Sequence, residues 1–243
     1  MLASPEHRLF VHRIAQAWAE GSEAPSQPEG TLWRGSWAGM CARKVAYMTT
    51  EQERTDPPSL ADHWRMGLGS VVHELLKPAV EHWLANDDDV VVNEEVKVKL
   101  GEYGHGHVDL VLYIKSTGKR VVLELKTING FGYKRAVEND DGPRHSHILQ
   151  GSMYAKAVDA DMLVIGYLAM ENISPARAES RGIDDIGRFS SEWHYPKDVF
   201  TQLATQEAAR LEGIAVKAHK DGPVSIPRRF AHSDPDIPFP AAI

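Results

Sequence analysis

Three charged side chains in a short β-rich segment give the strongest chemical signal in this chain. Asp109, Glu124 and Lys126 lie in GHVDLVLYIKSTGKRVVLELKT, where two apolar, β-branched runs flank the polar stretch Ser116–Lys119. Such a pattern predicts a hairpin. If the first and last residues of that stretch pair, Asp109 falls opposite Lys126, with Glu124 on the diagonal. Because side chains alternate along a strand, Glu124 and Lys126 share one face and Leu125 points to the other.

This face would place two carboxylates and one amine within a few ångströms of each other. A surface ion pair between Asp109 and Lys126 is the simpler alternative, and such pairs contribute roughly 0.2–1 kcal/mol. The neighbouring residues are strongly apolar, however, and include Val108, Leu110, Val122, Leu123 and Leu125. Charges in a buried strand are costly unless they are paired or bind a metal. The segment therefore predicts a hard-cation site with a lysine beside it.

Two helical segments carry further polar candidates. His147, Gln150, Gly151 and Tyr154 follow i, i+3, i+4, i+7 spacing within an expected helix from Ser146 to about Val158, so they share one face. The stripe suits contact with a phosphate backbone, but a solvated helix face is the more common origin of such a pattern.

His73 is the other helical candidate. It follows Gly69 and Ser70 by about one turn, and these small residues leave space beside the imidazole. A single helical histidine is more often structural or exposed, so the pattern alone leaves its role open.

The elements expected to position these residues form a mixed α/β domain with a central sheet flanked by helices. A Pro/Gly/Ser-rich loop follows the first helix, residues 128–144 form a polar connection, and the tail from Gly222 is irregular. Pro78 should kink or break the third helix near Lys77. Helices are expected at 6–20, 36–48 with Ser36 as N-cap, from DPPSLADHW to about Asn86, at 146–158 and at 197–220. Strands are expected near 90–99, 106–115, 120–127, 161–170 and, at a sheet edge, 187–195.

Composition bounds the classes of protein to consider. The 243 residues are 42% hydrophobic, which is enough for a sizeable core. We expect one domain over 1–243, with its core at about 60–170, an N-terminal helical part at 1–59 and a C-terminal strand, helix and Pro-rich tail at 171–243. The net charge of −7 counts mildly against nucleic-acid binding, although a local basic groove would still permit it. No stretch approaches the roughly 18 apolar residues of a membrane span, so we expect no membrane partner.

Cysteine usage is the remaining constraint. Cys41 is the single cysteine, which excludes an intramolecular disulfide or a multi-cysteine metal site within one chain. A reducing cytosol fits this usage.

Four short motifs in order give the chain a resemblance to a known family. They are GSVVH ending at His73, GHVD ending at Asp109, ELK at 124–126 and QGSMY at 150–154. Together they resemble the G-x-x-H, G-x-x-D, E-x-K and Q-x-x-x-Y pattern of the PD-(D/E)xK nuclease superfamily, and within it the RecB-like exonucleases of CRISPR adaptation and of phages. The first motif is one residue longer here. The resemblance covers roughly residues 33–170 and implies a restriction-endonuclease-like core.

The N-terminal part also resembles this branch loosely. Ser36 to Tyr47, with Cys41 and Arg43, looks like the S…C-x-R…Y helix of its iron–sulfur members, where that cysteine is one of four cluster ligands. Because no other cysteine is present, we expect no Fe–S cluster and predict that Cys41 is a small buried residue.

The resemblance also implies roles for the individual residues. Asp109, Glu124 and the Leu125 carbonyl would hold Mg²⁺ or Mn²⁺, with His73 as a further ligand. Lys126 would orient the attacking water and offset transition-state charge. The catalytic set is completed by Gln150 and Tyr154, and Glu95 is a secondary candidate. The expected DNA-binding residues are Arg43, Lys44, Lys134, Arg135, Arg144 and His147.

The function implied is a metal-dependent deoxyribonuclease, favoured as an exonuclease on single- or double-stranded DNA ends in recombination, repair or phage DNA processing. A structure-specific endonuclease on the same fold and a non-catalytic DNA-binding or assembly module are the alternatives. A homo-oligomer or a recombination protein partner stays open.

Overall fold

The computed structural model describes residues 30–52, 59–139 and 141–228. The chain divides into two compact units, one of 1–29 with 53–83 and one of 30–52 with 84–243. The described part of the first unit is formed almost entirely by helix α3 (Leu60–Leu84). Because this helix continues through Pro78, it is not broken near Lys77, and that alternative of the predicted kink or break is wrong. The helix expected at 6–20 lies outside the described residues. Within the described ranges, no helix combines the length and apolarity that a membrane span requires.

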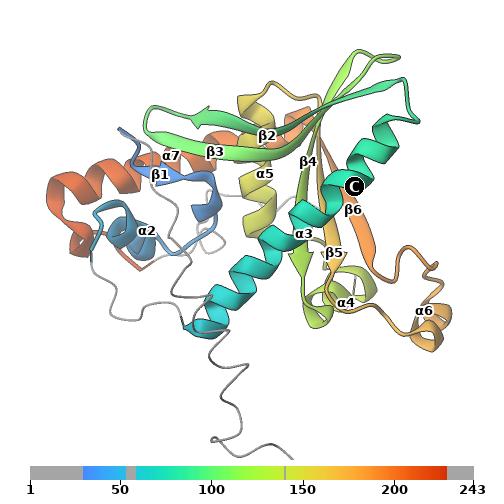
Figure 1. Cartoon of the computed structure of the whole chain (residues 1–243). Helices are drawn as coiled ribbons and strands as arrows, with labels where there is room; N and C mark the ends of the chain where they lie inside the picture. Colours follow the sequence, from blue (N-terminus) through green and yellow to red (C-terminus); the bar gives the residue numbers. More distant parts are fainter. Residues whose placement is uncertain (1–29, 53–58, 140, 229–243) are drawn as a thin grey trace, which may run out of the picture. The chain divides into compact units, whose positions relative to one another are not determined.

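The second unit is built on a mixed six-stranded sheet (Figure 1). Its strands run in the order β1-β3-β4-β5-β6, and β2 pairs with the long β3. The pairs β3–β4 and β5–β6 are antiparallel, whereas β4–β5 is parallel. The strands are β1 (Trp33–Arg34), β2 (Val90–Leu100), β3 (Gly104–Ile114), β4 (Lys119–Ile128), β5 (Met162–Ala169) and β6 (Ser190–Pro196). The predicted α/β class with a mixed central sheet is confirmed, and β6 lies at the end of the strand order, as expected for an edge strand.

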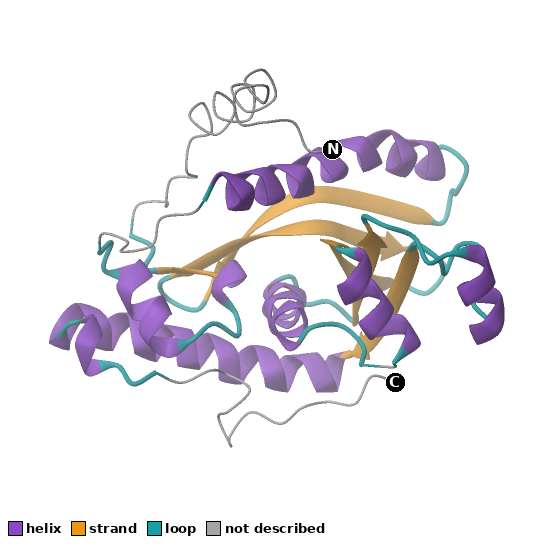
Figure 2. Ribbon diagram, turned by 90° about the horizontal axis from the view of Figure 1, so that it is seen from below, coloured by secondary structure: helices purple, strands orange, loops and turns teal. Residues whose placement is uncertain are grey.

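Helix α5 (His145–Ala157) lies between the sheet and α7 (Lys197–Asp221), as the view in Figure 2 shows. Seven of its residues are buried, from Ile148 to Ala155, because both sides of the helix are covered. The remaining helices of this unit are α2 (Ala42–Thr49), α4 (Gly130–Glu138), α6 (Pro175–Arg181) and the short 3-10 turns Gly35–Trp37 and Pro223–Ser225.

Several predicted boundaries shift. The helix expected at 36–48 begins only at Ala42, and Ser36 lies in the preceding 3-10 turn instead of capping it. Cys41 is the N-cap residue and is only partly buried.

The start of α5 and the connection before it also differ from the prediction. The N-cap residue of α5 is Arg144 and not Ser146. The connection at 128–144 contains α4, whose first turn is capped by the Asn129 side chain accepting the Gly132 N–H at 2.7 Å.

The hairpin register differs from the prediction by two residues. Ile114 pairs with Lys119 and Leu110 with Leu123, so the loop has four residues instead of two. Continuing this register places Asp109 opposite Glu124, and the predicted pairing of Asp109 with Lys126 is wrong. Because side chains alternate with a period of two, a slip of two residues leaves every side chain on its predicted face.

Tyr154 requires glycine at two places on the sheet side of α5. A Cβ atom at Gly106 would lie 2.3 Å from Tyr154 Cε1, and one at Gly35 would lie 2.5 Å from the same atom. The ring therefore packs directly on the backbone of β3 and of the 3-10 turn before α2. This contact sets how closely α5 approaches the strands that carry the charged residues.

We expect Gly106→Ala to lower the free energy of unfolding by about 1–3 kcal/mol, because the new methyl group overpacks against the Tyr154 ring. Chemical denaturation measures the change. Gly213→Ala is the matched control, since its Cβ would meet nothing within 4 Å in α7, and alanine in a helix is favoured by roughly 0.5–1 kcal/mol. Equal effects of the two substitutions would contradict the close packing of Tyr154.

Candidate active site

The charged residues lie where β4 parts from β3. The pairing of these two strands ends at Leu110–Leu123, whereas β4 stays paired with β5 as far as Ile128. Beyond the last β3–β4 pair, Asp109 Oδ2 accepts the Leu125 N–H at 2.9 Å. The Asp109 carboxylate thus replaces the backbone carbonyl that would otherwise accept this N–H in the sheet. This hydrogen bond holds Asp109 next to the Glu124–Lys126 segment.

Glu124 is the most constrained residue of the site, because its side chain is fully buried. Its Oε1 accepts hydrogen bonds from Lys126 Nζ at 2.5 Å and from Gln150 Nε2 at 2.9 Å. Its Oε2 is buried without a hydrogen-bond partner among the described residues. Burial raises the pKa of Glu124 to about 7; the Lys126 charge opposes this rise, and Asp109 adds to it.

Lys126 remains a cation in this setting. Burial disfavours its charge, but the nearby carboxylates of Glu124 and Asp109 outweigh burial and raise the lysine's pKa. The predicted face is therefore confirmed in its geometry: Asp109, Glu124 and Lys126 come together as two carboxylates and one ammonium group.

The polar stripe of α5 faces inward and is not the solvated face that the pattern alone would favour. Gln150 Nε2 lies 3.3 Å from the Tyr154 hydroxyl as well as bonding Glu124, and Tyr154 is buried. A Cβ atom at Gly151 would lie 2.8–2.9 Å from Ile165 and Leu163, so this glycine lets α5 pack on β5. The stripe thus connects the helix to the charged centre.

His147, the first residue of the stripe, is held as a neutral imidazole. Its Nδ1 lies 2.8 Å from the Tyr167 hydroxyl, which also accepts the Arg144 backbone N–H at 2.7 Å. Burial, together with the Lys126 and Arg144 charges, lowers the pKa of His147 to about 3. With the hydroxyl hydrogen directed to Nδ1, the ring proton sits on Nε2, which becomes a donor.

A cavity of about 400 Å³ opens beside this centre. It is lined by Ser36, Ala38, Gly39, Met40, Lys126, Ser146, His147 and Gln150. Its wall at Gly39 and Met40 is fixed from α7: the buried Glu207 accepts the Gly39 N–H at 2.8 Å, and Arg210 donates to both Glu207 and the Met40 carbonyl. The cavity therefore combines a rigid backbone wall with the lysine, the histidine and the glutamine.

The donor set suits a hard divalent cation, although it is incomplete within the described residues. Glu124 Oε2 is a buried carboxylate oxygen in need of a partner, and Asp109 adds a second carboxylate. Among the described residues no three His, Cys, Asp or Glu side chains converge on one point. The His73 side chain is outside what the structure describes, so its role stays a prediction. Glu95 is exposed, with φ of 48°, where the β2–β3 ladder is interrupted beside Asp109.

The expected DNA-binding residues are spread over three elements. Arg43 on α2 is engaged with the chain's C-terminal part, since its Nε donates to the Ile226 carbonyl at 2.7 Å, and its neighbour Lys44 is exposed. On α4, Lys134 is partly exposed and Arg135 pairs with Asp141 at 2.9 Å. Arg144 and His147 are the two that lie near the charged centre, since the charges of both Lys126 and Arg144 lower the pKa of His147.

Two contributors were missed by sequence reasoning. The sequence placed Tyr167 in an apolar strand and indicated no role for it. In the structure it is the register partner of Lys126, and its hydroxyl contacts His147. Glu207 lies in the helix expected at 197–220, and no local sequence pattern indicated that this acid would be buried. Both act across long sequence separations.

Comparison with known proteins places the fold. Neither known family models nor curated protein sequences match the chain. Among solved structures, SSO0001 is 17% identical with a TM-score of 0.50, covering 93% of this chain and 91% of its own. An alkaline exonuclease from Laribacter hongkongensis is 11% identical (TM-score 0.49; 84% and 95% covered). A phage related exonuclease from Haemophilus somnus is 11% identical (TM-score 0.48; 74% and 81% covered).

At these identities the likeness concerns the fold alone. The mixed sheet with flanking helices agrees with the α/β class expected from the sequence, and membership of the PD-(D/E)xK superfamily stays a prediction.

Stability of the metal-free protein should depend on pH through Glu124. Its pKa rises from 4.5 in the unfolded chain to about 7 in the fold, so the native state holds an extra proton between these values, and stability falls as the pH rises through them. This corresponds to roughly 3 kcal/mol. In chelator, the unfolding free energy of the wild type relative to Glu124→Gln should therefore decrease from pH 4.5 to pH 8. A pH-independent difference would rule out the raised pKa.

Proposed function

We propose that this protein is a divalent-cation-dependent deoxyribonuclease that acts on DNA ends as an exonuclease. The observation that carries the proposal is the fully buried Glu124 carboxylate, bonded on one oxygen to Lys126 and Gln150 and without a partner on the other among the described residues. An acidic centre with an adjacent ammonium group has no use in simple phosphate binding, but it suits hydrolysis of a phosphodiester assisted by a cation.

Asp109, Glu124, the Leu125 carbonyl and His73 are the proposed ligands of Mg²⁺ or Mn²⁺. Oxygen donors of this kind suit hard cations, and a histidine widens tolerance toward Mn²⁺. When bound, the cation would polarise the scissile phosphate and make a water molecule more acidic.

The protein's own residues supply positioning and charge. The Lys126 ammonium would orient the attacking water and offset the negative charge that develops on the phosphate oxygens. Gln150 holds the Glu124 carboxylate in place through a hydrogen bond. Tyr154 sets how closely α5, which carries Gln150, approaches the sheet. His147, neutral and protonated on Nε2, would donate a hydrogen bond to a phosphate oxygen in the cavity that it lines.

DNA is the proposed polymer, because the basic residue Arg144 lies beside the site in a chain whose overall charge is negative. A local excess of cations near the chemistry would attract the phosphate backbone despite the global charge.

Replacing Lys126 tests the activity directly. Wild-type protein with Mg²⁺ or Mn²⁺ should degrade linear DNA, and Lys126→Ala should be at least about 100-fold slower, because one transition-state donor is lost. End-labelled single- and double-stranded substrates provide the measurement, and Lys220→Ala, at the exposed end of α7, is the control. Absence of wild-type cleavage, or equal rates for the Lys126 variant, would contradict the proposal. Cutting of covalently closed circles would replace the exonuclease with an endonuclease.

Metal binding provides an independent test. We expect calorimetry to detect Mn²⁺ binding to the wild type and at least tenfold weaker binding to Asp109→Asn, because one carboxylate ligand loses its charge. Asp185→Asn, with a side chain 87% exposed on the surface, should bind like the wild type. A wild type that binds neither Mn²⁺ nor Mg²⁺ would favour a non-catalytic DNA-binding module instead.

A further inference from the structure

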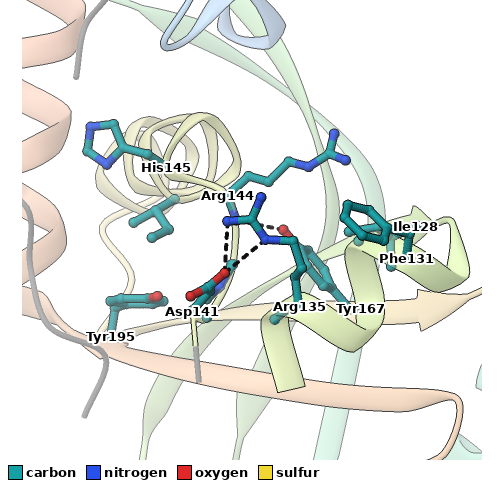
Figure 3. A pocket seen from close by; sticks show the side chains of 13 residues that line it. Ile128, Phe131, Arg135, Asp141, Arg144, His145, Tyr167 and Tyr195 are labelled. Atoms are coloured by element: carbon teal, nitrogen blue, oxygen red, sulfur yellow. Dashed lines mark hydrogen bonds and ion pairs between the residues drawn. The ribbon is translucent and has the colours of Figure 1, made fainter. Parts of the chain in front are cut away.

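A second cavity, of about 450 Å³, lies next to the proposed active site (Figure 3). It is formed by α4, the segment from Asp141 to His145 and the ends of β4, β5 and β6. The side chains that matter for its chemistry are Ile128, Phe131, Arg135, Arg144, Tyr167 and Tyr195. This volume is in the range of small-ligand sites.

Phe131 is an aromatic ring left out of the core. Its side chain is 73% exposed, although it stands at the second position of α4 and lines the cavity. The glycines on either side are closely packed: a Cβ at Gly130 would lie 2.7 Å from Glu171, and one at Gly132 would lie 2.8 Å from Ile128. The start of the helix is therefore held against the sheet, with the ring presented at the cavity.

The charges of the cavity favour an anion. Arg135 pairs with Asp141, as the dashed lines in Figure 3 show, so these two charges offset each other. Arg144 is exposed and adds a further positive charge. The buried Tyr195 hydroxyl, which lines the same cavity, has no hydrogen-bond partner among the described residues. A flat ring, a cation and a hydroxyl group together suit a ligand with an aromatic part and a phosphate.

The cavity adjoins the charged centre along one face of the sheet. Lys126 and Ile128 are two residues apart on β4, about 7 Å along one face of the strand, and Tyr167 is the register partner of Lys126. Tyr167 lines this cavity, and its hydroxyl accepts from the Arg144 N–H and contacts His147, which lines the first cavity. A step of this length is comparable with the spacing of neighbouring phosphates in an extended nucleic-acid strand.

We infer that this cavity holds one unpaired nucleotide of the substrate strand, next to the nucleotide at the scissile bond. The base stacks on Phe131, and the adjoining phosphate lies against Arg144. Stacking on an aromatic ring is available to every base, so the site would tolerate any sequence but would require a single-stranded segment. The inference rests on the proposed nuclease function, since it assumes a nucleic-acid substrate.

Binding without cleavage tests the inference. In a Lys126→Ala background with chelator present, fluorescence anisotropy measures the affinity for a short single-stranded oligonucleotide. Phe131→Ala should weaken binding about 5- to 100-fold, which is the range for loss of one stacked base, and Phe131→Trp should retain it. Tyr113→Ala, another exposed aromatic residue (43%) on β3, is the matched control and should bind unchanged.

Abasic substitution locates the stacked base. If one base lies on Phe131, the loss of affinity caused by Phe131→Ala should disappear for the oligonucleotide that lacks the base at one particular position. For oligonucleotides that lack a base at any other position, the loss of affinity should persist. Arg144→Ala should lower the slope of log affinity against log salt by about one, and Arg144→Lys should restore it.

The outcomes separate this inference from the proposed function. Equal affinity of Phe131→Ala and its parent, or a cost that is the same at every abasic position, overturns the nucleotide site even if the wild type cleaves DNA. A protein that binds with the expected Phe131 and abasic dependence but never cleaves overturns the nuclease activity and leaves the nucleotide site intact.

Discussion

The interaction on which the described site depends is the burial of one carboxylate. Glu124 lies fully inside the protein, where an isolated charge would be very costly. Lys126 and Gln150 satisfy one of its oxygens, and the second is left for a partner that those residues do not supply. A buried ion pair of this kind is weak evidence for stability, because desolvation of both groups offsets their attraction. The buried pair is therefore better explained by the proposed cation-assisted chemistry than by folding energy.

The packing around α5 follows from the need to reach that carboxylate. Gln150 bonds Glu124 only if the helix lies close to the sheet, and close approach is possible because glycine stands at each point of contact. Gly106 and Gly35 receive the Tyr154 ring, while Gly151 accommodates the side chains of β5. The glycine of the G-x-x-D motif, Gly106, therefore has a steric role, because it makes room for Tyr154, the tyrosine of the Q-x-x-x-Y motif.

The sequence predicted the shared face of Asp109, Glu124 and Lys126 even though it gave the wrong register. Alternation along a strand has a period of two, so an error of two residues changes the partners but not the faces. The parallel pairing of β4 with β5 depends on residues about forty positions apart, and no local pattern reveals it, which is why Tyr167 was missed. Helix α4 was missed because its Gly-Phe-Gly start matches a loop, although Asn129 caps it. The order of the expected helices and strands correctly indicated a mixed α/β fold.

Charge balance explains why the neutral state of His147 matters. The centre contains two carboxylates and one ammonium group, which leaves an excess of negative charge when both acids are ionised, and this excess attracts a cation. A protonated histidine beside Lys126 would cancel that excess. Burial, together with the Lys126 and Arg144 charges, prevents this by disfavouring a second ring proton, and the Tyr167 hydroxyl lies against Nδ1. In the proposed function, the positive charge that would attract a phosphate comes from Arg144, whose backbone N–H donates to the same hydroxyl. In the proposed function, the negative charge that would attract the metal and the positive charge that would attract the nucleic acid therefore lie in separate places.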